Sequence, residues 1–446
     1  MSDQKIAAVI LAAGKGTRMK SQKAKVLHEI GGRAMIGHVI DAVKALNPVE
    51  TVVVIGDHAP EAGDYARDID PKISVALQSP ANGTAHAVEQ AMPALETFNG
   101  AVLVLYADTP LVSPQTMSDL ADTIAAGAAV AVLGFRPDDP GAYGRLVLDD
   151  TKALSAIIEA RDASPDELEI DLCNSGVMAI NAQSLKVLLP KVDNNNAKKE
   201  YYLTDLVALA RAANERCVVI EADEDEVLGV NSRVELAIAE EVFQDRQRIE
   251  AMDAGATLLD PSTVYFSYDT KLGKDVVIGQ NVVFGPGVFI ADNAHIKAFS
   301  HLEGTTIDEE ATIGPFARIR PGATIKKNAK IGNFVEIKKS LINAGAKVSH
   351  LTYIGDADIG ADANIGAGTI TCNYDGYAKH KTIIGERAFV GSNSALVAPV
   401  KIGKGAYVGS GSVITKNVDD DALAVARGRQ SELPDWAAKF RAKQKK

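Results

Sequence analysis

The sequence is poor in cysteine. Its 446 residues include 3 cysteines, Cys173, Cys217 and Cys372, which lie far apart and form no CxxC pair. A disulfide framework needs an even set and a thiolate zinc site needs paired cysteines, so neither is expected. This cysteine usage favours a reducing cytoplasm.

The sequence also lacks an excess of positive charge and any long apolar run. Its formal net charge is -11 at pH 7, which argues against general binding to nucleic acid or to anionic membrane. A small anionic ligand would need a local basic site. No apolar stretch is long enough to cross a bilayer, so we expect neither a membrane anchor nor a signal peptide.

The chain is longer than a single domain usually is, and the pattern of apolar residues changes midway, so we expect two domains. In the first half, short runs rich in Val, Ile and Leu alternate with helix-like segments, which predicts a Rossmann-like α/β domain with a mostly parallel sheet. The predicted strands are 6–11, 51–55, 101–106 and 129–135, and the predicted helices are 34–46, 84–95 and 114–125. We predict domains at 1–230 and 253–446, a linking helix at 231–252, and a basic helical tail at 435–446.

After residue 260 an aliphatic or aromatic residue recurs every six positions. The series begins at Leu272, Ile278 and Phe284 and, with slips of one residue, continues to Ile365. A period of six fits a short strand plus a turn, and three such units close one coil of roughly 18 residues. The anchors would then stack inside a parallel β-helix, with small residues at the corners where the chain bends tightly. A β-sandwich with fortuitous spacing is the alternative.

The six-residue frame breaks once, after Ile365, and returns at Ile384. The excess around residues 371–382 must leave the coil as a loop. A polar loop on a rigid solenoid is a natural place for chemistry. A tolerated surface insertion is the alternative, but it would not explain so many hydrogen-bonding side chains, namely Asn373, Tyr374, Asp375, Tyr377, Lys379 and His380.

In the first domain, residues 6–19 form a buried strand followed by a loop with Gly14, Gly16 and Arg18. Backbone N–H groups of such a loop can approach phosphate, and Arg18 can supply charge-assisted bonds. The spacing matches neither a P-loop nor a dinucleotide fingerprint. An ordinary turn is the alternative.

Two further features of this domain suit a nucleotide and its metal. Asp108 follows the strand at 101–106, so its carboxylate would lie at the carboxyl end of a central strand and suit Mg²⁺. A turn cap before Pro110 is the alternative. Gln78, with Gly83 and Thr84 at a helix start, could read a base edge.

Three residues of the second domain suit a phosphate pocket and a general base. Arg320 and Lys338 lie one coil of about 18 residues apart, which would stack them as a phosphate pocket, and a solvated basic stripe is the alternative. His350 is the candidate base, because an amine must lose a proton when it attacks a thioester. A packing or surface role is the alternative for a lone histidine.

The segment from Leu11 to Met19 reads L-A-A-G-K-G-T-R-M and is followed by Lys25-Val26-Leu27. This pattern resembles that of the sugar-1-phosphate nucleotidyltransferases. With the hexapeptide half added, nearly the whole chain resembles the bifunctional family that combines N-acetylglucosamine-1-phosphate uridyltransferase with glucosamine-1-phosphate N-acetyltransferase activity. The resemblance implies a left-handed β-helix that acetylates glucosamine-1-phosphate with acetyl-CoA. It also implies that the first domain then transfers uridylyl from UTP to N-acetylglucosamine-1-phosphate and releases pyrophosphate.

For the first domain, the resemblance implies that Arg18 and Lys25 are catalytic and that Asp108 and Asn231 hold Mg²⁺. Two residues depart from the family pattern: Ala24 stands where proline is usual, and Ala107 stands where glycine is usual. The implied UDP-N-acetylglucosamine site consists of Leu11, Ala12, Ala13, Gly14, Lys25, Gln78, Gly83, Thr84, Tyr106, Asp108, Gly144, Glu159, Asn174 and Asn231.

For the second domain, the resemblance makes His350 the catalytic base and implies a homotrimer. Ser410 stands where alanine is common. A backbone N–H near Tyr374 could stabilise the oxyanion. The implied ligand sets are Arg320, Lys338, Tyr353, Asn364 and Lys379 for glucosamine-1-phosphate, and Ala367, Asn373, Tyr374, Ser392, Ser410 and Arg427 for acetyl-CoA.

Two rival functions stay open. One is a monofunctional sugar-1-phosphate nucleotidyltransferase whose β-helix is structural or regulatory. The other is a metal-dependent β-helix enzyme using His295, His301, His350 and His380. His295 and His301 are six residues apart, hence on neighbouring faces, which disfavours a shared metal.

Overall fold

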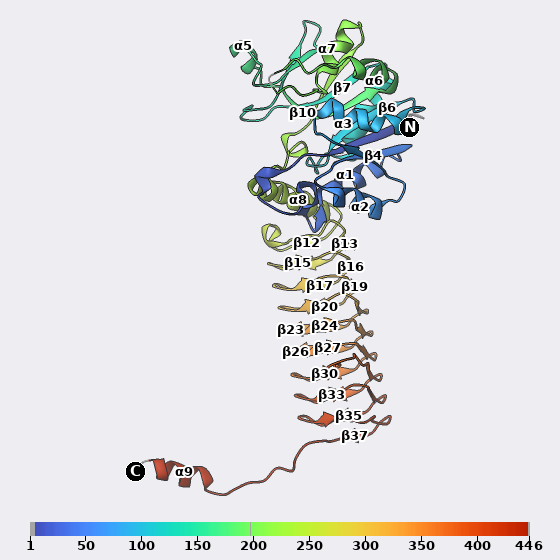
Figure 1. The fold of residues 1–446 in the computed structure, drawn as a ribbon. Helices are drawn as coiled ribbons and strands as arrows, with labels where there is room; N and C mark the ends of the chain where they lie inside the picture. Colours follow the sequence, from blue (N-terminus) through green and yellow to red (C-terminus); the bar gives the residue numbers. More distant parts are fainter. Residues whose placement is uncertain (1–4, 197, 445–446) are drawn as a thin grey trace. The chain divides into compact units, whose positions relative to one another are not determined.

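The chain folds into two compact units, Met1–Gln244 and Asp245–Lys446 (Figure 1). The computed structural model describes residues 5–196 and 198–444. The division falls inside helix α8 (Arg233–Asp253), near the helix predicted at 231–252. No helix in the described part of the chain is long and apolar enough to span a membrane.

The first unit is built around a sheet with strand order β11-β7-β10-β6-β1-β4-β5. Its pairs are parallel except those of β10, which runs antiparallel to β6 and β7, so the predicted mostly parallel sheet is confirmed. A hairpin of β8 (Arg145–Leu148) and β9 (Leu154–Ile158) joins β10. The path strands are β1 (Ile6–Ala12), β4 (Glu50–Gly56), β5 (Ser74–Gln78), β6 (Ala101–Tyr106), β7 (Val130–Phe135), β10 (Cys173–Asn181) and β11 (Cys217–Glu221).

Helices cover both faces of this sheet. Ala8 and Ile10 of β1 belong to one buried cluster with α1 (Met35–Lys44), α2 (Pro60–Ile69) and α4 (Pro114–Ala125). Ala7 and Val9 belong to another with α3 (Thr84–Ala91), α6 (Ala182–Leu188) and α7 (Asp205–Ala212). A strand buried on both faces reads as a continuous apolar run, which is why the strand at 6–11 could be predicted.

Several local features differ from the prediction. The helix expected at 84–95 ends as α3 at Ala91 and continues as a 3-10 turn over Met92–Leu95, because Pro93 lacks the N–H that an α-helix needs. Helix α2 and strand β5 were not predicted, and neither were the strands and helices between residues 136 and 230. The buried residues of α2 are Ala62, Gly63 and Ala66, so no large apolar side chain marks a helical period.

The second unit is the predicted left-handed parallel β-helix, in which each coil adds a short strand to each of three sheets. The first face runs from β12 (Thr257–Leu258) to β37 (Leu423–Ala424). The second face runs from β15 (Val283–Phe284) to β36 (Val413–Ile414). The third face runs from β13 (Lys271–Leu272) to β34 (Val400–Ile402).

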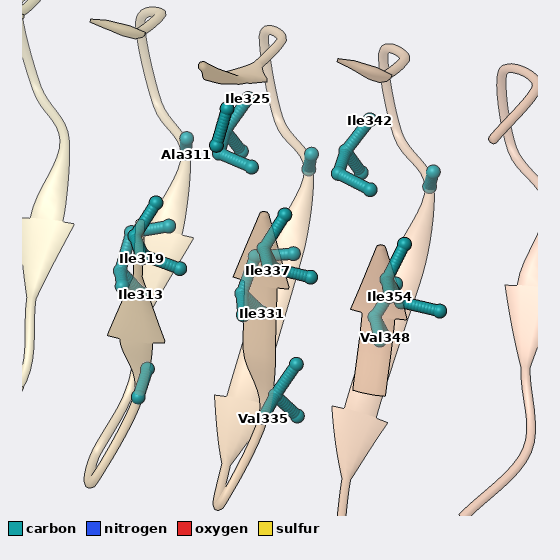
Figure 2. Close-up of a cluster of buried hydrophobic side chains, with 14 of the residues drawn as sticks. Ala311, Ile313, Ile319, Ile325, Ile331, Val335, Ile337, Ile342, Val348 and Ile354 are labelled. Atoms are coloured by element: carbon teal, nitrogen blue, oxygen red, sulfur yellow. The ribbon is translucent and has the colours of Figure 1, made fainter. Parts of the chain in front are cut away.

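The repeat anchors form columns inside the coil, as predicted (Figure 2). On the second face Ile319, Ile337 and Ile354 are successive register partners, and each is at most 1 % exposed. Fully burying one such side chain contributes about 1.5–3 kcal/mol. The six-residue period therefore encodes the core of this unit.

The corners differ in part from the expectation. Alanines such as Ala311, Ala317 and Ala329 are buried two positions before an anchor. At the bends, the backbone of some residues adopts the left-handed conformation; these residues include Phe299 and Phe316, with φ of 60° and 54°. The expectation that a bend requires a small residue is therefore wrong at these corners, because these two aromatic side chains are 51 % and 44 % exposed and do not enter the core.

Two segments leave the coil as expected. Residues 373–381 separate β30 (Ile370–Cys372) from β31 (Thr382–Ile384), which confirms the predicted loop. Helix α9 (Trp436–Gln444) lies in the tail predicted at 435–446, of which residues 445–446 lie outside the described residues.

Candidate active sites

The carboxyl ends of neighbouring parallel strands form one end of the first unit. Strands β1, β6, β4 and β5 end at Ala12, Tyr106, Gly56 and Gln78, so the residues that follow them meet at the same edge. A cavity of about 280 Å³ opens there. Its lining includes ten of the fourteen residues implied for the UDP-N-acetylglucosamine site, Leu11, Ala12, Ala13, Gly14, Lys25, Gln78, Gly83, Thr84, Tyr106 and Asp108.

Two glycines shape this cavity. Gly16 has φ of +58°, and a Cβ there would lie 2.6 Å from Cβ of Lys25, so the loop can wrap around Lys25 only with glycine at this position. Gly83 has φ of +110°, and a Cβ there would lie 2.5 Å from the carbonyl oxygen of Tyr201. The start of α3 is thereby packed directly against the chain at residue 201.

The side chains of Lys25, Asp108 and Asn231 meet at one point. The Lys25 ammonium donates to Oδ2 of Asp108 in a short contact and to Oδ1 of Asn231 at 3.1 Å. Asn231 is brought there because the N–H of Val230 donates to the carbonyl of Asp108 at 2.8 Å. Two oxygen donors therefore converge on one positive charge.

This arrangement fits a metal that needs few protein ligands. In the described part of the chain, no group of three or more His, Cys, Asp or Glu side chains could hold a metal ion. Asp108 and Asn231 offer one carboxylate and one amide oxygen, and Mg²⁺ commonly uses one or two protein oxygens with water and phosphate. The predicted pair is thus close enough together to share a cation.

Arg18 lies on a 3-10 turn, Thr17–Met19, that projects from the glycine loop. It lines a second cavity of about 380 Å³ together with Tyr106, Asp108 and Asn231. Sequence reasoning did not identify other residues that line this cavity, Ala142, Tyr143, Ser175, Val227 and Glu235. The signal for Glu235 was the Ser-x-x-Glu pattern from Ser232, since Glu235 accepts from the N–H of Asn231 at 2.8 Å and caps the start of α8.

A third cavity of about 450 Å³ shares Arg18 with the second and contains Glu159. Burial raises the pKa of the Glu159 carboxyl above its usual value, although the nearby Lys198 opposes this shift. Sequence reasoning missed Arg161, Lys198 and Tyr202, which line the same cavity. These residues follow no periodic pattern that would have revealed them.

The remaining predicted sugar residues lie beside the second cavity. The N–H of Asn174 donates to the carbonyl of Gly144 at 2.8 Å, which joins β10 to the segment before β8. Burial is also the main cause that raises the pKa of the Tyr106 hydroxyl above its usual value. Tyr106 therefore stays neutral and can offer a hydroxyl to a ligand.

The structure accommodates both departures from the family pattern. Ala107 is fully buried, belongs to the core cluster under α1 and α4, and lines none of the three cavities. Ala24 has φ of -54°, close to the value that proline would impose. Neither substitution therefore intrudes on the site.

In the second unit, Arg320 and Lys338 stack as predicted. They follow β21 (Arg318–Ile319) and end β24 (Glu336–Lys338), whose register pairs Ile319 with Ile337. The pKa of Lys338 is lowered first by Arg320 and then by Lys379 of the loop. Three cations therefore lie together at the edge between the second and third faces.

Neighbouring groups complete this cluster. Nη1 of Arg320 donates to Oε1 of Glu336 at 2.7 Å, which fixes the guanidinium. Tyr353, the register partner of Glu336, begins β27 (Tyr353–Gly355). A Cβ on Gly355 would lie 2.8 Å from Nδ2 of Asn373 and would also collide with the Tyr353 hydroxyl, so both groups converge over Gly355.

His350 lies at the other edge of the second face, where it ends β26 (Lys347–His350). Its side chain is exposed, and Nδ1 is 2.7 Å from Oδ1 of Asn333, its register partner on β23 (Lys330–Asn333). An amide oxygen only accepts hydrogen bonds, so Nδ1 carries the proton and Nε2 of the neutral ring is free to accept one. Asn333 was not predicted, although the repeat places it one coil before His350.

The predicted acetyl-CoA residues fall into two groups. Ala367, in the first group, lies one coil after His350. Ser392 and Ser410 follow it in the next two coils. The register of β26 with β29 (Asn364–Ile365), β32 (Phe389–Val390) and β35 (Tyr407–Val408) places these residues in one column. Nη1 of Arg427 donates to the carbonyl of Ser410 at 2.7 Å, so Arg427 joins this group. Asn373 and Tyr374 instead belong to the loop beside Lys338.

Within a single chain, one residue of the predicted glucosamine-1-phosphate set lies away from the others. Asn364 begins β29 on the first face, whereas Arg320, Lys338, Tyr353 and Lys379 gather around the second. His295 and His301 lie on the first and second faces, on neighbouring sheets as expected.

Known proteins match both units. Family models of a MobA-like NTP transferase domain, a GMPPB C-terminal domain and a bacterial transferase hexapeptide with six repeats match residues 8–165, 301–387 and 381–416. The chain is 55 % identical over 446 residues to bifunctional protein GlmU of Paramagnetospirillum magneticum, covering 100 % of this chain and 98 % of the relative. It is 58 % identical over 435 residues to bifunctional protein GlmU of Maricaulis maris, covering 98 % and 96 %. A solved UDP-glucose pyrophosphorylase complexed with UDP-glucose is 16 % identical, with a TM-score of 0.45 over 54 % of this chain and 99 % of that chain.

Proposed function

The chain belongs to the family of the bifunctional GlmU proteins, and from this premise we propose that it catalyses two successive transfers. The β-helix acetylates glucosamine-1-phosphate with acetyl-CoA. The α/β unit then transfers uridylyl from UTP to N-acetylglucosamine-1-phosphate, which forms UDP-N-acetylglucosamine and pyrophosphate. The observation that best supports a second reaction is the solvent-facing His350, whose tautomer Asn333 fixes.

In uridylyl transfer, a phosphate oxygen of the sugar phosphate attacks the α-phosphorus of UTP, and the bond to the β-phosphate breaks. The nucleophile is already an anion, so no strong base is needed. The protein supplies position and positive charge. We assign the charge to Arg18 and Lys25, which line adjoining cavities that share Tyr106 and Asp108.

The same cavities suggest how the substrates are bound. Nε2 of Gln78 donates to the carbonyl of Gly83 at 2.8 Å, so its amide oxygen is the group that can accept the N3–H of uracil. The backbone at residues 11–14 would hold the nucleotide. Gly144, Glu159 and Asn174 would contact the N-acetylglucosamine part.

We propose that Asp108 and Asn231 hold Mg²⁺. When bound, the ion would neutralise charge that develops on the pyrophosphate. The support is the convergence of both side-chain oxygens on the Lys25 ammonium, since a point that attracts one cation suits another. Lys25 would then turn toward phosphate.

In acetyl transfer, the amine nitrogen of glucosamine-1-phosphate attacks the carbonyl carbon of acetyl-CoA. Nε2 of His350 accepts the proton that the amine loses, the C–S bond breaks, and coenzyme A leaves. Arg320, Lys338, Tyr353 and Lys379 would bind the phosphate. A backbone N–H near Tyr374 would stabilise the oxyanion.

Assembly and location are also proposals. In a homotrimer, a neighbouring copy would supply residues that a single chain keeps apart, such as Asn364. The acetyl-CoA site would then be lined from both edges of the second face, by Ala367, Asn373, Tyr374, Ser392, Ser410 and Arg427.

We assign uridylyl transfer to residues 1–230, acetyl transfer to 253–446 and a connecting role to 231–252. The free thiols of Cys173, Cys217 and Cys372 favour a reducing cytoplasm.

One coupled assay tests both reactions. The protein is given glucosamine-1-phosphate, acetyl-CoA, UTP and Mg²⁺, and each is omitted in turn. Coenzyme A thiol should appear without UTP, and pyrophosphate should appear only when the sugar has been acetylated. Pyrophosphate release from N-acetylglucosamine-1-phosphate without any coenzyme A release from the unacetylated sugar would favour the monofunctional alternative.

A further inference from the structure

We propose that the contact between Asp375 and His380 holds the loop at 373–381 in the shape that places Lys379 beside Lys338, which makes His380 a positioning residue for the sugar phosphate. The inference rests on the proposed acetyl transfer. It concerns a side chain whose contact is with Asp375, inside the loop.

The Asp375 carboxylate organises the loop from within. Its Oδ1 accepts from the N–H of Tyr377 at 2.8 Å and from that of Ala378 at 2.7 Å. Its Oδ2 is 2.7 Å from Nε2 of His380. These contacts hold the pKa of Asp375 well below its usual range, so the carboxylate is ionised.

The two ends of the loop are joined across its base. The N–H of His380 donates to the carbonyl of Asn373 at 2.8 Å, and Tyr374 pairs with Lys379 in an antiparallel bridge. Nδ2 of Asn373 donates to Oδ2 of Asp356 at 2.5 Å, which ties the base to the preceding coil. Lys379 is therefore bridged to Tyr374 at this base and is the neighbour in sequence of His380, which Asp375 contacts.

This support matters because the position of Lys379 is electrostatically unfavourable in the empty site. Lys338 already lies beside Arg320, and the depressed pKa of Lys338 reports repulsion from both Arg320 and Lys379. A phosphate dianion would relieve that repulsion, whereas in its absence the repulsion opposes the placement of Lys379 beside Lys338. The contact between His380 and Asp375 holds the loop against this repulsion, so less binding energy is spent on ordering the loop when the substrate binds.

His380→Ala tests the proposal in the full-length protein. The KM for glucosamine-1-phosphate should rise about fivefold, because an exposed charged contact is worth at most about 1 kcal/mol. The kcat should change less than twofold. Inorganic phosphate, used as a competitive inhibitor, should lose affinity by the same factor. His380→Gln keeps a donor for Asp375 and should restore most of the affinity.

Two matched variants separate positioning from other effects. Tyr377→Ala changes a side chain that is 98 % exposed in the same loop, and it should leave both kinetic constants unchanged. Lys379→Met should raise the KM by itself, and adding His380→Ala should cause no further rise, because His380 acts through Lys379.

Three results would overturn the proposal: an unchanged KM in His380→Ala, an equal loss of phosphate affinity in Tyr377→Ala, or additive effects in the double variant. Failure of the proposed function gives a different result. In that case the unsubstituted protein would release no coenzyme A from acetyl-CoA and glucosamine-1-phosphate.

Discussion

The two units of this chain assemble their sites by different routes. In the first, Gly14 and Asp108 come from distant parts of the sequence and meet because parallel strands end at one edge of a sheet, and the N–H of Val230 brings Asn231 to Asp108. In the second, Asn333, His350 and Ala367 lie 17 residues apart in succession and meet because each coil repeats the last. A sheet site depends on strand order, whereas a solenoid site depends on repeat length.

The comparison also teaches that the two activities should be separable. The cavities of the first unit and the cation cluster of the second share no residue. Each unit also has its own buried clusters. A substitution in one site should therefore leave the other reaction intact.

The largest effect is expected for Asp108→Ala. Without this carboxylate the proposed Mg²⁺ would lose a ligand and Lys25 would lose its partner, so uridylyl transfer should fall by about 10³-fold. Acetyl transfer should stay within twofold of the unsubstituted protein. Pyrophosphate release and coenzyme A release, measured on the same preparation, check both statements. Loss of both activities in a folded variant would contradict separate sites.

The reverse experiment is His350→Ala. Removal of the proposed proton acceptor should lower acetyl transfer by about 10²-fold to 10³-fold, while uridylyl transfer stays unchanged. The kcat for acetyl-CoA turnover at saturating glucosamine-1-phosphate is the quantity to measure. A fully active variant would mean that another group accepts the proton.

The contrast between the units also explains what the sequence could predict. The period of the repeat located the buried isoleucines and the stacking of Arg320 on Lys338, because coil length sets register directly. In the α/β unit, the apolar runs located β1 and β6. Strand order could not be read, because nothing local says that β10 inserts antiparallel between β6 and β7.

There are also physical reasons why some residues of the candidate sites were not predicted. Lys198 and Tyr202 line the cavity of Glu159 from a loop without periodicity, so only the folded chain shows their proximity. The repeat could have predicted Asn333. The coil between Asn333 and His350 has 17 residues instead of 18, so a slip of one residue has to be counted to pair them. The local sequence pattern therefore predicted the strands and helices, whereas only the folded structure shows which side chains lie together in a site.

Asn333→Ala should give a moderate effect confined to the second unit. Without the amide oxygen, Nδ1 of His350 loses the acceptor that selects its tautomer, and the free Nε2 lone pair is no longer favoured. The kcat of acetyl transfer should fall about tenfold, the value of one hydrogen bond. Asn333→Asp retains an acceptor and should keep most of the activity. Equal losses in both variants would argue that Asn333 has only a packing role.

The smallest effect should appear in the stability of the first unit alone. Burial raises the pKa of Glu159, so the folded state binds this proton more tightly than the unfolded state does. Ionisation therefore destabilises the fold as the pH rises from the ordinary glutamate value through the raised one. Glu159→Gln should stabilise this unit above that window, by less than about 1 kcal/mol because the group is partly exposed, and should have no effect below it.

Glu167→Gln is the matched control with the opposite sign. The backbone N–H of Ser164 lowers the pKa of Glu167, so its ionised form stabilises the fold above the ordinary glutamate value and the benefit disappears as the pH falls through the lowered one. Thermal unfolding of both variants at neutral and acidic pH measures the two differences. Because both glutamates belong to the first unit, a shift in the transition of the β-helix would show that the units do not unfold independently.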